Sequence, residues 1–483
     1  MTIYESMEKP LQTKEEQDKL IQAYANHSSF YSGLVKSNCD QKIKGKYNEA
    51  DCDQFYALIF HDWKKALRIL IENNYVKPEY KDQLFALYRY VSGLKPKTRD
   101  EVMQIMDYES IKDETLRAGM ESFRWNAIGE FSGWNHIHSN CVNYGLSKKQ
   151  VVKHRLYLNC DSTVTHRIML RFIQKCNAKR SAYYFKYDSY GDRDDNLVFY
   201  CDTEHLSSYI EILKEIVREE NLRSHVYEPP LCTATIDGWM GYGSEPYHED
   251  EEDRTSFNQK REELMEKCIK EESGKWLLSH IDTHLFVNGR DVPYKYVFIS
   301  CVVEETVKNY LNATTNSEYC KKNKGYTLDD LKNVDLRSYV YGYLMKNFDK
   351  VLAYYKNPEA PFRVEFPFQK GTLSFNKKIL EEVRKKQVKF YWEHSDRFQK
   401  QLMNQIHSAF LDHGIDPDNF ACETYVMEEL GKPKSQKDSI KIDVSPSIRS
   451  EESFVSNRRT KSGYTYMPMT EEEIKKSQSK LGF

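Results

Sequence analysis

The side chains best suited to chemistry lie between Lys153 and Arg261. Lys186 stands in the aromatic segment Tyr183-Tyr-Phe-Lys-Tyr187, where at least one face of a strand is expected to be buried. Burial or a neighbouring cation lowers the pKa of a lysine amine, and an amine of lowered pKa can act as a base near neutral pH. Alternation also permits Lys186 on the solvent face of an edge strand, so both placements stay open.

Arginines that could bind an anion surround this lysine in the sequence. Arg193 follows the turn at Gly191 and directly precedes Asp194-Asp-Asn196. Its planar guanidinium could bind a phosphate through two hydrogen bonds, which a lysine cannot do. The alternative is a solvated hairpin arginine that pairs with the neighbouring aspartates. Further candidates for phosphate binding are Arg155, Arg167, Arg171 and Arg261.

A general acid and hydrogen-bonding groups could come from the same stretch. His154 and His166 are the candidate acids, although a single histidine is more often structural. Other candidate pocket residues are Asn196, Tyr157, Tyr200 and Tyr242. The segment Gly241-Tyr-Gly-Ser lacks the Walker and Rossmann spacings. We interpret it as a glycine-rich loop whose glycines either let backbone amides approach an anion or, as we favour, form a tight turn.

The elements that position these residues follow from a change of periodicity near residue 153. Leu156 and Leu158 alternate with polar and aromatic residues, which indicates a half-buried strand. In order, we predict a strand over 154–160, a helix from Asp161, strands over 182–187 and 196–201 joined at Gly191, a helix over 204–220, an extended piece over 233–236 and a helix over 256–272. This order predicts an α+β fold with a mixed sheet and helices on one face.

The 483 residues exceed one ordinary domain. We predict a helical N-terminal domain over 1–150, an α+β domain over 151–425 and a disordered tail over 431–483, where Lys, Ser, Asp and Glu dominate. A capping box at Thr13-Lys-Glu-Glu16 marks the first helix. Further helices are expected over 51–74, 78–92, 111–131, 328–352 and 377–411, with short mixed elements over 276–320.

Charge and cysteine content narrow the classes of function. The formal net charge is −2, which gives no electrostatic reason to expect a nucleic-acid partner. Eleven scattered cysteines without a CxxC pair indicate buried free thiols in a reducing compartment, so we expect no metal and no cofactor. No apolar run suits a signal peptide or a membrane span. We therefore expect no membrane partner, and a protein that is cytoplasmic or exported without a cleaved signal peptide.

Five short motifs, in one order, carry a resemblance to a known family. They are His154-Arg-Leu-Tyr-Leu-Asn159, Tyr184-Phe-Lys-Tyr187, Arg193-x-Asp-Asn-Leu-Val-Phe-Tyr200, Gly241-Tyr-Gly-Ser-Glu-Pro246 and Ser256-Phe-x-x-x-Arg261. Together they resemble the HopA-type family of type III secretion effectors and relatives encoded in lanthipeptide gene clusters. The resemblance covers roughly residues 150–280. It implies an α+β domain behind a helical N-terminal region.

The same resemblance implies two classes of function. Its peptide-tailoring members imply a lyase that eliminates phosphate from phosphoserine or phosphothreonine in a protein or peptide, with Lys186 as the base and Arg193 binding the phosphate. Its effector members imply a non-enzymatic interaction protein that binds a partner protein. An ADP-ribosyl transferase is a third interpretation, but no convincing Ser-x-Ser strand is present. The acidic run Glu249–Asp253 would repel a phosphorylated substrate if it lined the site. Convergence of Lys186 and Arg193 would favour the lyase.

Overall fold

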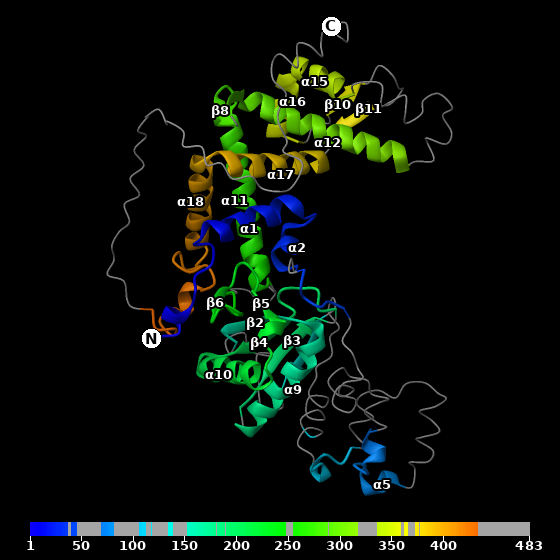
Figure 1. The fold of residues 1–483 in the computed structure, drawn as a ribbon, viewed down its shortest axis with the longest axis vertical. Coiled ribbons are helices and arrows are strands. Elements are labelled where there is room, and N and C mark those ends of the chain that lie inside the picture. The colour runs from blue at the N-terminus through cyan, green and yellow to red at the C-terminus, as the bar shows by residue number, and fades with distance from the viewer. Residues whose placement is uncertain are drawn as a thin grey trace. The chain divides into compact units, whose positions relative to one another are not determined.

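The computed structural model describes residues 1–36, 40–45, 69–81, 106–112, 117, 134–138, 152–179, 181–188, 190–247, 255–287, 289–316, 336–358, 362–365, 372–375 and 377–432. The chain forms two compact units, whose elements are labelled in Figure 1. The first, here called the sheet unit, comprises Met1–Ala23, His27–Met265 and His407–Lys432. The second, the helical unit, comprises Tyr24–Asn26, Glu266–Ile406 and Pro433–Phe483.

The sheet unit is built on a seven-stranded sheet with the order β1-β3-β4-β2-β7-β6, in which β5 also pairs with β2. Its strands are β1 (Trp134–His138), β2 (His154–Cys160), β3 (Tyr184–Asp188), β4 (Leu197–Cys201), β5 (Val226–Tyr227), β6 (Ala234–Ile236) and β7 (Met240–Ser244). Every pairing in the described part of this sheet is antiparallel, where a mixed sheet was predicted. The predicted α+β class is confirmed.

Helices α9 (Ser162–Ala178) and α10 (Thr203–Glu219) pack side by side, and α10 also packs on β2 and β4 (Figure 1). Phe172 of α9 is central to this face of the sheet. Its ring centroid lies 4.4 Å from that of Phe199 on β4, and 4.9 Å from that of Tyr209 on α10. The predicted order of strands and helices over residues 154–220 is therefore confirmed, and this sheet face is apolar because its alternate residues pack on both helices.

The glycines of β7 allow close packing on the opposite face. A Cβ atom at Gly243 would lie 2.6 Å from Cε2 of Phe257, and one at Gly241 would lie 2.7 Å from Cβ of Pro229. Phe257 is the first residue of α11 (Phe257–His280). The prediction of a glycine-rich loop at 241–246 is wrong for 241–244, because these glycines form a strand that needs small residues for packing. Helix α11 runs beyond its predicted end at residue 272.

The N-terminal and C-terminal segments meet within the sheet unit. Tyr4 N donates to Leu430 O at 3.1 Å, and the Tyr4 hydroxyl donates to Asp416 Oδ2 at 2.8 Å. Ser244 N, at the end of β7, donates to Ala421 O at 2.8 Å. Residues from both segments thus close the unit around the sheet. The short elements here are η1 (Tyr4–Ser6), α1 (Lys14–Asn26), α2 (Phe30–Val35), α5 (Pro78–Lys81), η3 (Tyr108–Ser110), η4 (Arg223–His225) and η5 (Thr424–Val426).

The predicted helical N-terminal region is confirmed in part. The capping box of α1 is present, since Thr13 Oγ1 accepts from Glu16 N and Glu16 Oε2 accepts from Thr13 N. Residues 134–138 form strand β1 and not helix, because pairing with β3 satisfies their backbone groups. The helices predicted over 51–74, 78–92 and 111–131 lie largely outside the described residues, as does the tail from residue 433. The domain boundaries drawn from the sequence stay a prediction.

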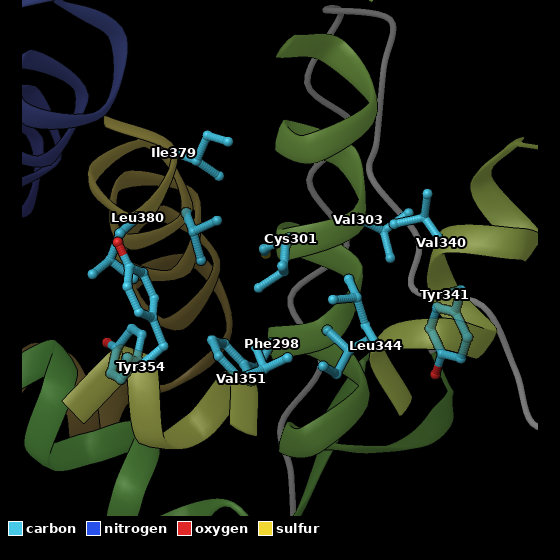
Figure 2. Close-up of a cluster of buried hydrophobic side chains, with 14 of the residues drawn as sticks. Phe298, Cys301, Val303, Val340, Tyr341, Leu344, Val351, Tyr354, Ile379 and Leu380 are labelled. Atoms are coloured by element: carbon cyan, nitrogen blue, oxygen red, sulfur yellow. The ribbon is translucent and has the colours of Figure 1, made fainter. Parts of the chain in front are cut away.

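The helical unit has a core of aromatic and aliphatic side chains (Figure 2). Its elements are β8 (His284–Val287), β9 (Arg290–Pro293), α12 (Tyr294–Asn316), α15 (Leu336–Lys346), α16 (Phe348–Lys356), β10 (Phe362–Glu365), β11 (Thr372–Phe375), α17 (Lys377–His394) and α18 (Asp396–Asp412). Figure 2 shows Phe298 of α12, Leu344 of α15, Val351 of α16 and Leu380 of α17 in this core. The helix predicted over 377–411 is two helices with a break at Ser395. Of the helix predicted over 328–352, residues 328–335 lie outside the described residues, and the rest is two helices with a break at Asn347.

The described cysteines agree with the sequence interpretation. They are Cys160, Cys176, Cys201, Cys232, Cys268, Cys301 and Cys422, and each is a buried free thiol. In the part of the chain that the structure describes, no helix combines the length and the apolar character that crossing a bilayer requires.

Candidate functional site

A cluster of cations and aromatic rings lies on the sheet face opposite α9 and α10. Arg155 of β2 pairs with Tyr200 of β4, and Lys186 of β3 pairs with Val198 of β4. Directly paired residues, and residues two apart on one strand, share a face. Arg155, Lys186 and Tyr200 therefore share this face. We call them, together with Trp134, Arg193 and Tyr31, the site cluster.

The ammonium group of Lys186 contacts aromatic rings and, among the described residues, no carboxylate. Its Nζ lies 4.2 Å from the ring centroid of Trp134 and 5.9 Å from that of Tyr200. The side chain is half-buried, and it makes no hydrogen bond or ion pair with any residue that the structure describes. Burial, followed by the charge of Arg155, lowers the pKa of Lys186 to about 8. Roughly a tenth of this amine is therefore neutral at pH 7.

Arg193 lies against the same tryptophan as Lys186. Its guanidinium carbon is 5.1 Å from the Trp134 ring centroid and 5.6 Å from that of Tyr31. Nε and Nη2 donate to the two carboxylate oxygens of Asp195 at 2.8 and 3.1 Å, and Nη2 also donates to the Tyr31 hydroxyl at 3.1 Å. Lys186 and Arg193 thus converge, although Arg193 also makes the aspartate pair that the sequence left as its alternative.

Arg155 approaches Lys186 from the other side. Its guanidinium carbon lies 5.1 Å from the ring centroid of Tyr200, which stacks on Tyr184 at 4.5 Å. Nε and Nη2 of Arg155 both donate to the carboxylate of Glu245, the latter at 2.6 Å. With Lys186 protonated, three cations face the carboxylates of Asp195 and Glu245. Asp188 of β3, which pairs with Trp134, is a third carboxylate on this face, and the charge of Arg193 also acts on it.

Neither guanidinium is saturated by its carboxylate. Nη1 of Arg155 and Nη1 of Arg193 donate to no described residue, whereas Nε and Nη2 of each are engaged. Each arginine therefore keeps a nitrogen that can donate to a further oxygen. Besides burial, the charges of both arginines lower the pKa of Lys186.

His154 and Tyr242 lie on the other face of the sheet. His154 Nδ1 shares a hydrogen bond with the Tyr242 hydroxyl at 2.8 Å, and Nε2 shares one with Thr203 Oγ1 at 3.0 Å. Burial lowers the pKa of His154 to about 4. This histidine is therefore neutral at pH 7 and is not brought to Lys186. Tyr242 pairs with Leu156, on the face that α10 covers.

Three further candidates lie on α9, away from the site cluster. His166 is buried, Arg167 is exposed, and Arg171 donates to Glu220. Asn196 is a brace between strands: its Oδ1 accepts from Cys160 N at 3.0 Å, and its Nδ2 donates to Cys160 O at 2.9 Å. The structure brings none of these four into the cluster.

Tyr157 of β2 lies on the same sheet face as the cluster but beneath α11, and Arg261 is a residue of α11 itself. The guanidinium carbon of Arg261 lies 3.8 Å from the Phe257 ring centroid, and its Nη2 lies 3.0 Å from Glu423 Oε1. Arg261 therefore braces the C-terminal segment. Tyr157 is buried against Phe257, with ring centroids 5.8 Å apart. Its hydroxyl has no hydrogen-bond partner among the described residues.

Sequence reasoning missed Trp134 and Tyr31. Both precede the rest of the cluster in the chain, and no local pattern marks either one. Glu245 lies within the motif Gly241-Tyr-Gly-Ser-Glu-Pro246 but was not predicted as a site residue, while Asp195 was considered as a partner of Arg193. The only signal that could have found Trp134 is pairing of its strand with β3, which residues 134–138 alone do not predict.

Comparison with known proteins identifies a domain within this chain. One solved structure, "The structure of the effector protein from Pseudomonas syringae pv. tomato strain DC3000", is 14% identical, covering 53% of this chain and 85% of that chain with a TM-score of 0.27. We draw no argument from so low a TM-score. A comparison with curated proteins gives no significant match. The HopA1 effector protein family matches residues 141–296. This chain therefore carries a HopA1 effector family domain over residues 141–296, which contains Lys186, Arg155 and Arg193.

Proposed function

We propose that the protein is a lyase that eliminates phosphate from phosphoserine or phosphothreonine in a protein or peptide. One observation carries the proposal: a lysine with a pKa of about 8 shares the Trp134 ring with Arg193 and the Tyr200 ring with Arg155, and each arginine keeps an unengaged nitrogen. An amine of this pKa is a suitable base near neutral pH, and guanidinium groups bind phosphate well. No metal or other cofactor is needed for the reaction as proposed.

The proposed reaction uses Lys186 and the two arginines in separate roles. Neutral Nζ of Lys186 removes the Cα proton of the phosphorylated residue. The electron pair of that C–H bond forms the Cα–Cβ double bond, while the Cβ–O bond breaks and the oxygen leaves with the phosphate. Nη1 of Arg193 and Nη1 of Arg155 donate to the phosphate of the bound substrate and keep these hydrogen bonds as the phosphate departs. The products are inorganic phosphate and a dehydroamino acid within the peptide.

Lysine must be neutral to act, so the rate should rise with pH through about 8 and then level off. The peptide substrate would be phosphorylated and anionic at its reactive residue, and the unengaged nitrogens of Arg155 and Arg193 could bind its phosphate. Tyr200 adds a hydrogen-bond donor to the cluster, because burial raises the pKa of its hydroxyl, which is protonated near neutral pH.

The decisive experiment is incubation of the purified protein with a library of phosphoserine and phosphothreonine peptides, followed by mass spectrometry. A loss of the mass of phosphoric acid, with a product that then adds a thiol, is the expected result. Lys186→Ala should abolish it. Lys175→Ala is the matched control, because Lys175 lies on α9 and pairs with Glu215 and Glu219. An unchanged library mass with folded protein would reject the lyase.

The second candidate is a non-enzymatic interaction protein that binds a partner protein. The observation in its favour is that Asp195 and Glu245 already occupy two donors of each arginine, as in a purely structural network. Partner capture that survives Lys186→Ala, without turnover of any phosphopeptide, is the outcome that would favour this candidate.

A further inference from the structure

The turn that carries Arg193 is bound by a segment distant in sequence. Residues 30–45 contain α2 and the chain that follows it. Asp194 N donates to Val35 O at 2.7 Å, and Gly45 N donates to Tyr190 O at 3.0 Å. An isolated antiparallel bridge joins Lys36 to Arg193. These backbone contacts fix both ends of the turn between β3 and β4.

Lys42 holds the backbone of Arg193 itself. Its side chain is only 5% exposed, and its Nζ donates to Arg193 O at 2.6 Å and to Asn159 Oδ1 at 2.7 Å. Asn159 in turn donates through Nδ2 to Asp194 Oδ1 at 3.1 Å. A buried amine is costly unless its hydrogen bonds are made, so this lysine ties the turn to β2 in a single geometry.

Tyr31 holds the side chain of the same arginine. Its hydroxyl accepts from Arg193 Nη2, and its ring lies 5.6 Å from the guanidinium carbon. Asp195 engages the same guanidinium and is itself bound by Asn258 Nδ2 at 3.0 Å. The segment 30–45 thus fixes Arg193 twice, through its carbonyl oxygen and through its guanidinium.

We propose that Lys42 and Tyr31 are positioning residues that hold Arg193 against Trp134, beside the amine of Lys186. The proposal deepens the proposed lyase site, and its kinetic test rests on that function. Both residues lie outside the family match over residues 141–296. The working site therefore extends beyond the matched domain into the N-terminal segment.

The proposal has a consequence that does not require turnover. Among the described residues, the charged or titratable groups around Lys186 include Arg155 of β2, Arg193 and Asp195 of the turn, Tyr200 of β4 and Tyr31 of α2. Asp188 lies two residues along β3, and the register partner of Lys186 on β1 is His136. Arg193 is one of the two cations that lower the pKa of Lys186. If Arg193 is released from its position, the pKa of Lys186 should rise.

The first experiment measures labelling of Lys186 by an amine-reactive anhydride as a function of pH, using mass spectrometry of the peptide that contains it. The variants are Lys42→Met, which removes the carbonyl contact, and Tyr31→Phe, which keeps the ring and removes the hydroxyl that binds Arg193. Lys175→Met is the control. We expect a midpoint near pH 8 for the parent and the control. The midpoint should move to higher pH in Tyr31→Phe, and further in Lys42→Met.

The second experiment measures turnover of a phosphopeptide by the full chain. We expect KM to rise about tenfold in Lys42→Met and about threefold in Tyr31→Phe, with kcat changed less, because the affected group binds the phosphate. A merely structural role would lower the amount of folded enzyme without this change in KM.

The outcomes are separable. Folded variants with the parent's labelling midpoint and KM would overturn the proposal. If Lys42→Met does not fold, Tyr31→Phe decides alone. If the parent turns over no phosphopeptide, the lyase fails, while the labelling midpoints still decide whether Lys42 and Tyr31 position Arg193.

Discussion

The two faces of the sheet in the sheet unit are made by alternate residues of the same strands, yet they differ in chemistry. Leu156 and Phe199 face α9 and α10 and are fully buried. Arg155 and Tyr200, the residues next to them in the sequence, lie on the opposite face and belong to the site cluster. The first face gains stability by burying apolar area, whereas the second holds a half-buried lysine whose charge is costly. We infer that the apolar face offsets the cost of the charged one.

The largest expected effect comes from damage to the apolar face. Phe172→Ala should lower the free energy of unfolding by about 3–5 kcal/mol, because Phe172 is fully buried among aromatic rings. Chemical denaturation measures this loss. The labelling midpoint of Lys186 should stay near pH 8 in the folded variant. A loss below about 1 kcal/mol would contradict the assigned role of this face.

Protonation of His154 on unfolding should lower the free energy of unfolding at acidic pH. Its pKa is about 4 in the folded protein and near 6.5 when unfolded, so the unfolded chain binds more protons between these values. Its contribution to stability is complete above pH 6.5 and is lost as the pH falls towards 4, up to about 3 kcal/mol.

Denaturation of the parent and of His154→Gln at several pH values tests this contribution. The difference in stability between the two should shrink as the pH falls from 6.5 to 4. A constant difference would show that His154 does not titrate with unfolding in this range.

Gly243→Ala tests the packing of α11 on the charged face. The added Cβ would meet the Phe257 ring at 2.6 Å, so we expect a loss of about 1–3 kcal/mol in the free energy of unfolding. Gly274→Ala is the control, since no atom lies within 4 Å of its Cβ position and alanine favours helix. Thermal unfolding should separate the two. Equal effects would argue against close packing at Gly243.

Lys186→Met should give the smallest effect, and in the opposite direction. The lowered pKa corresponds to a penalty of about 3 kcal/mol at pH 7, but methionine also loses the contacts of the ammonium group with the rings of Trp134 and Tyr200, so we expect a net gain on the order of 1 kcal/mol. The folded pKa of about 8 lies below the ordinary value of 10.5, so the parent's penalty is complete below pH 8 and fades as the pH rises towards 10.5. The gain measured by denaturation should fade over the same range. If Lys186→Met is less stable than the parent at pH 7, the inference that the charged face lowers the stability of the protein is wrong.

Much of the fold could be predicted because its signals are local. Alternation along residues 154–160 located β2, and the capping box located α1. The same alternation also predicts the face on which His154 lies. Because His154 is two residues from Leu156, the two share a face, and Arg155 lies on the opposite one. Gly241 and Gly243 misled because glycine is common in turns, while here a distant aromatic ring required the space.

The site was predictable only in part, because only some of its residues are marked by a local sequence signal. Lys186 was conspicuous because a lysine is unusual within an aromatic strand, and Arg193 because it follows a turn. Trp134 and Tyr31 reach the cluster through long-range pairing and packing, which local sequence does not encode. Arg167 and Arg171 had suitable spacing but lie on a helix that covers the other face.

The closure of the sheet unit by both of its terminal segments bears on how the protein is made. A ribosome releases Tyr4 and the whole sheet long before residues 407–432, which supply Ala421 O to Ser244 N and Leu430 O to Tyr4 N. Contacts so far apart in sequence form slowly, and a chain awaiting them exposes backbone groups at the end of β7. The nascent protein should therefore depend on chaperones that shield these backbone groups until residues 407–432 emerge from the ribosome.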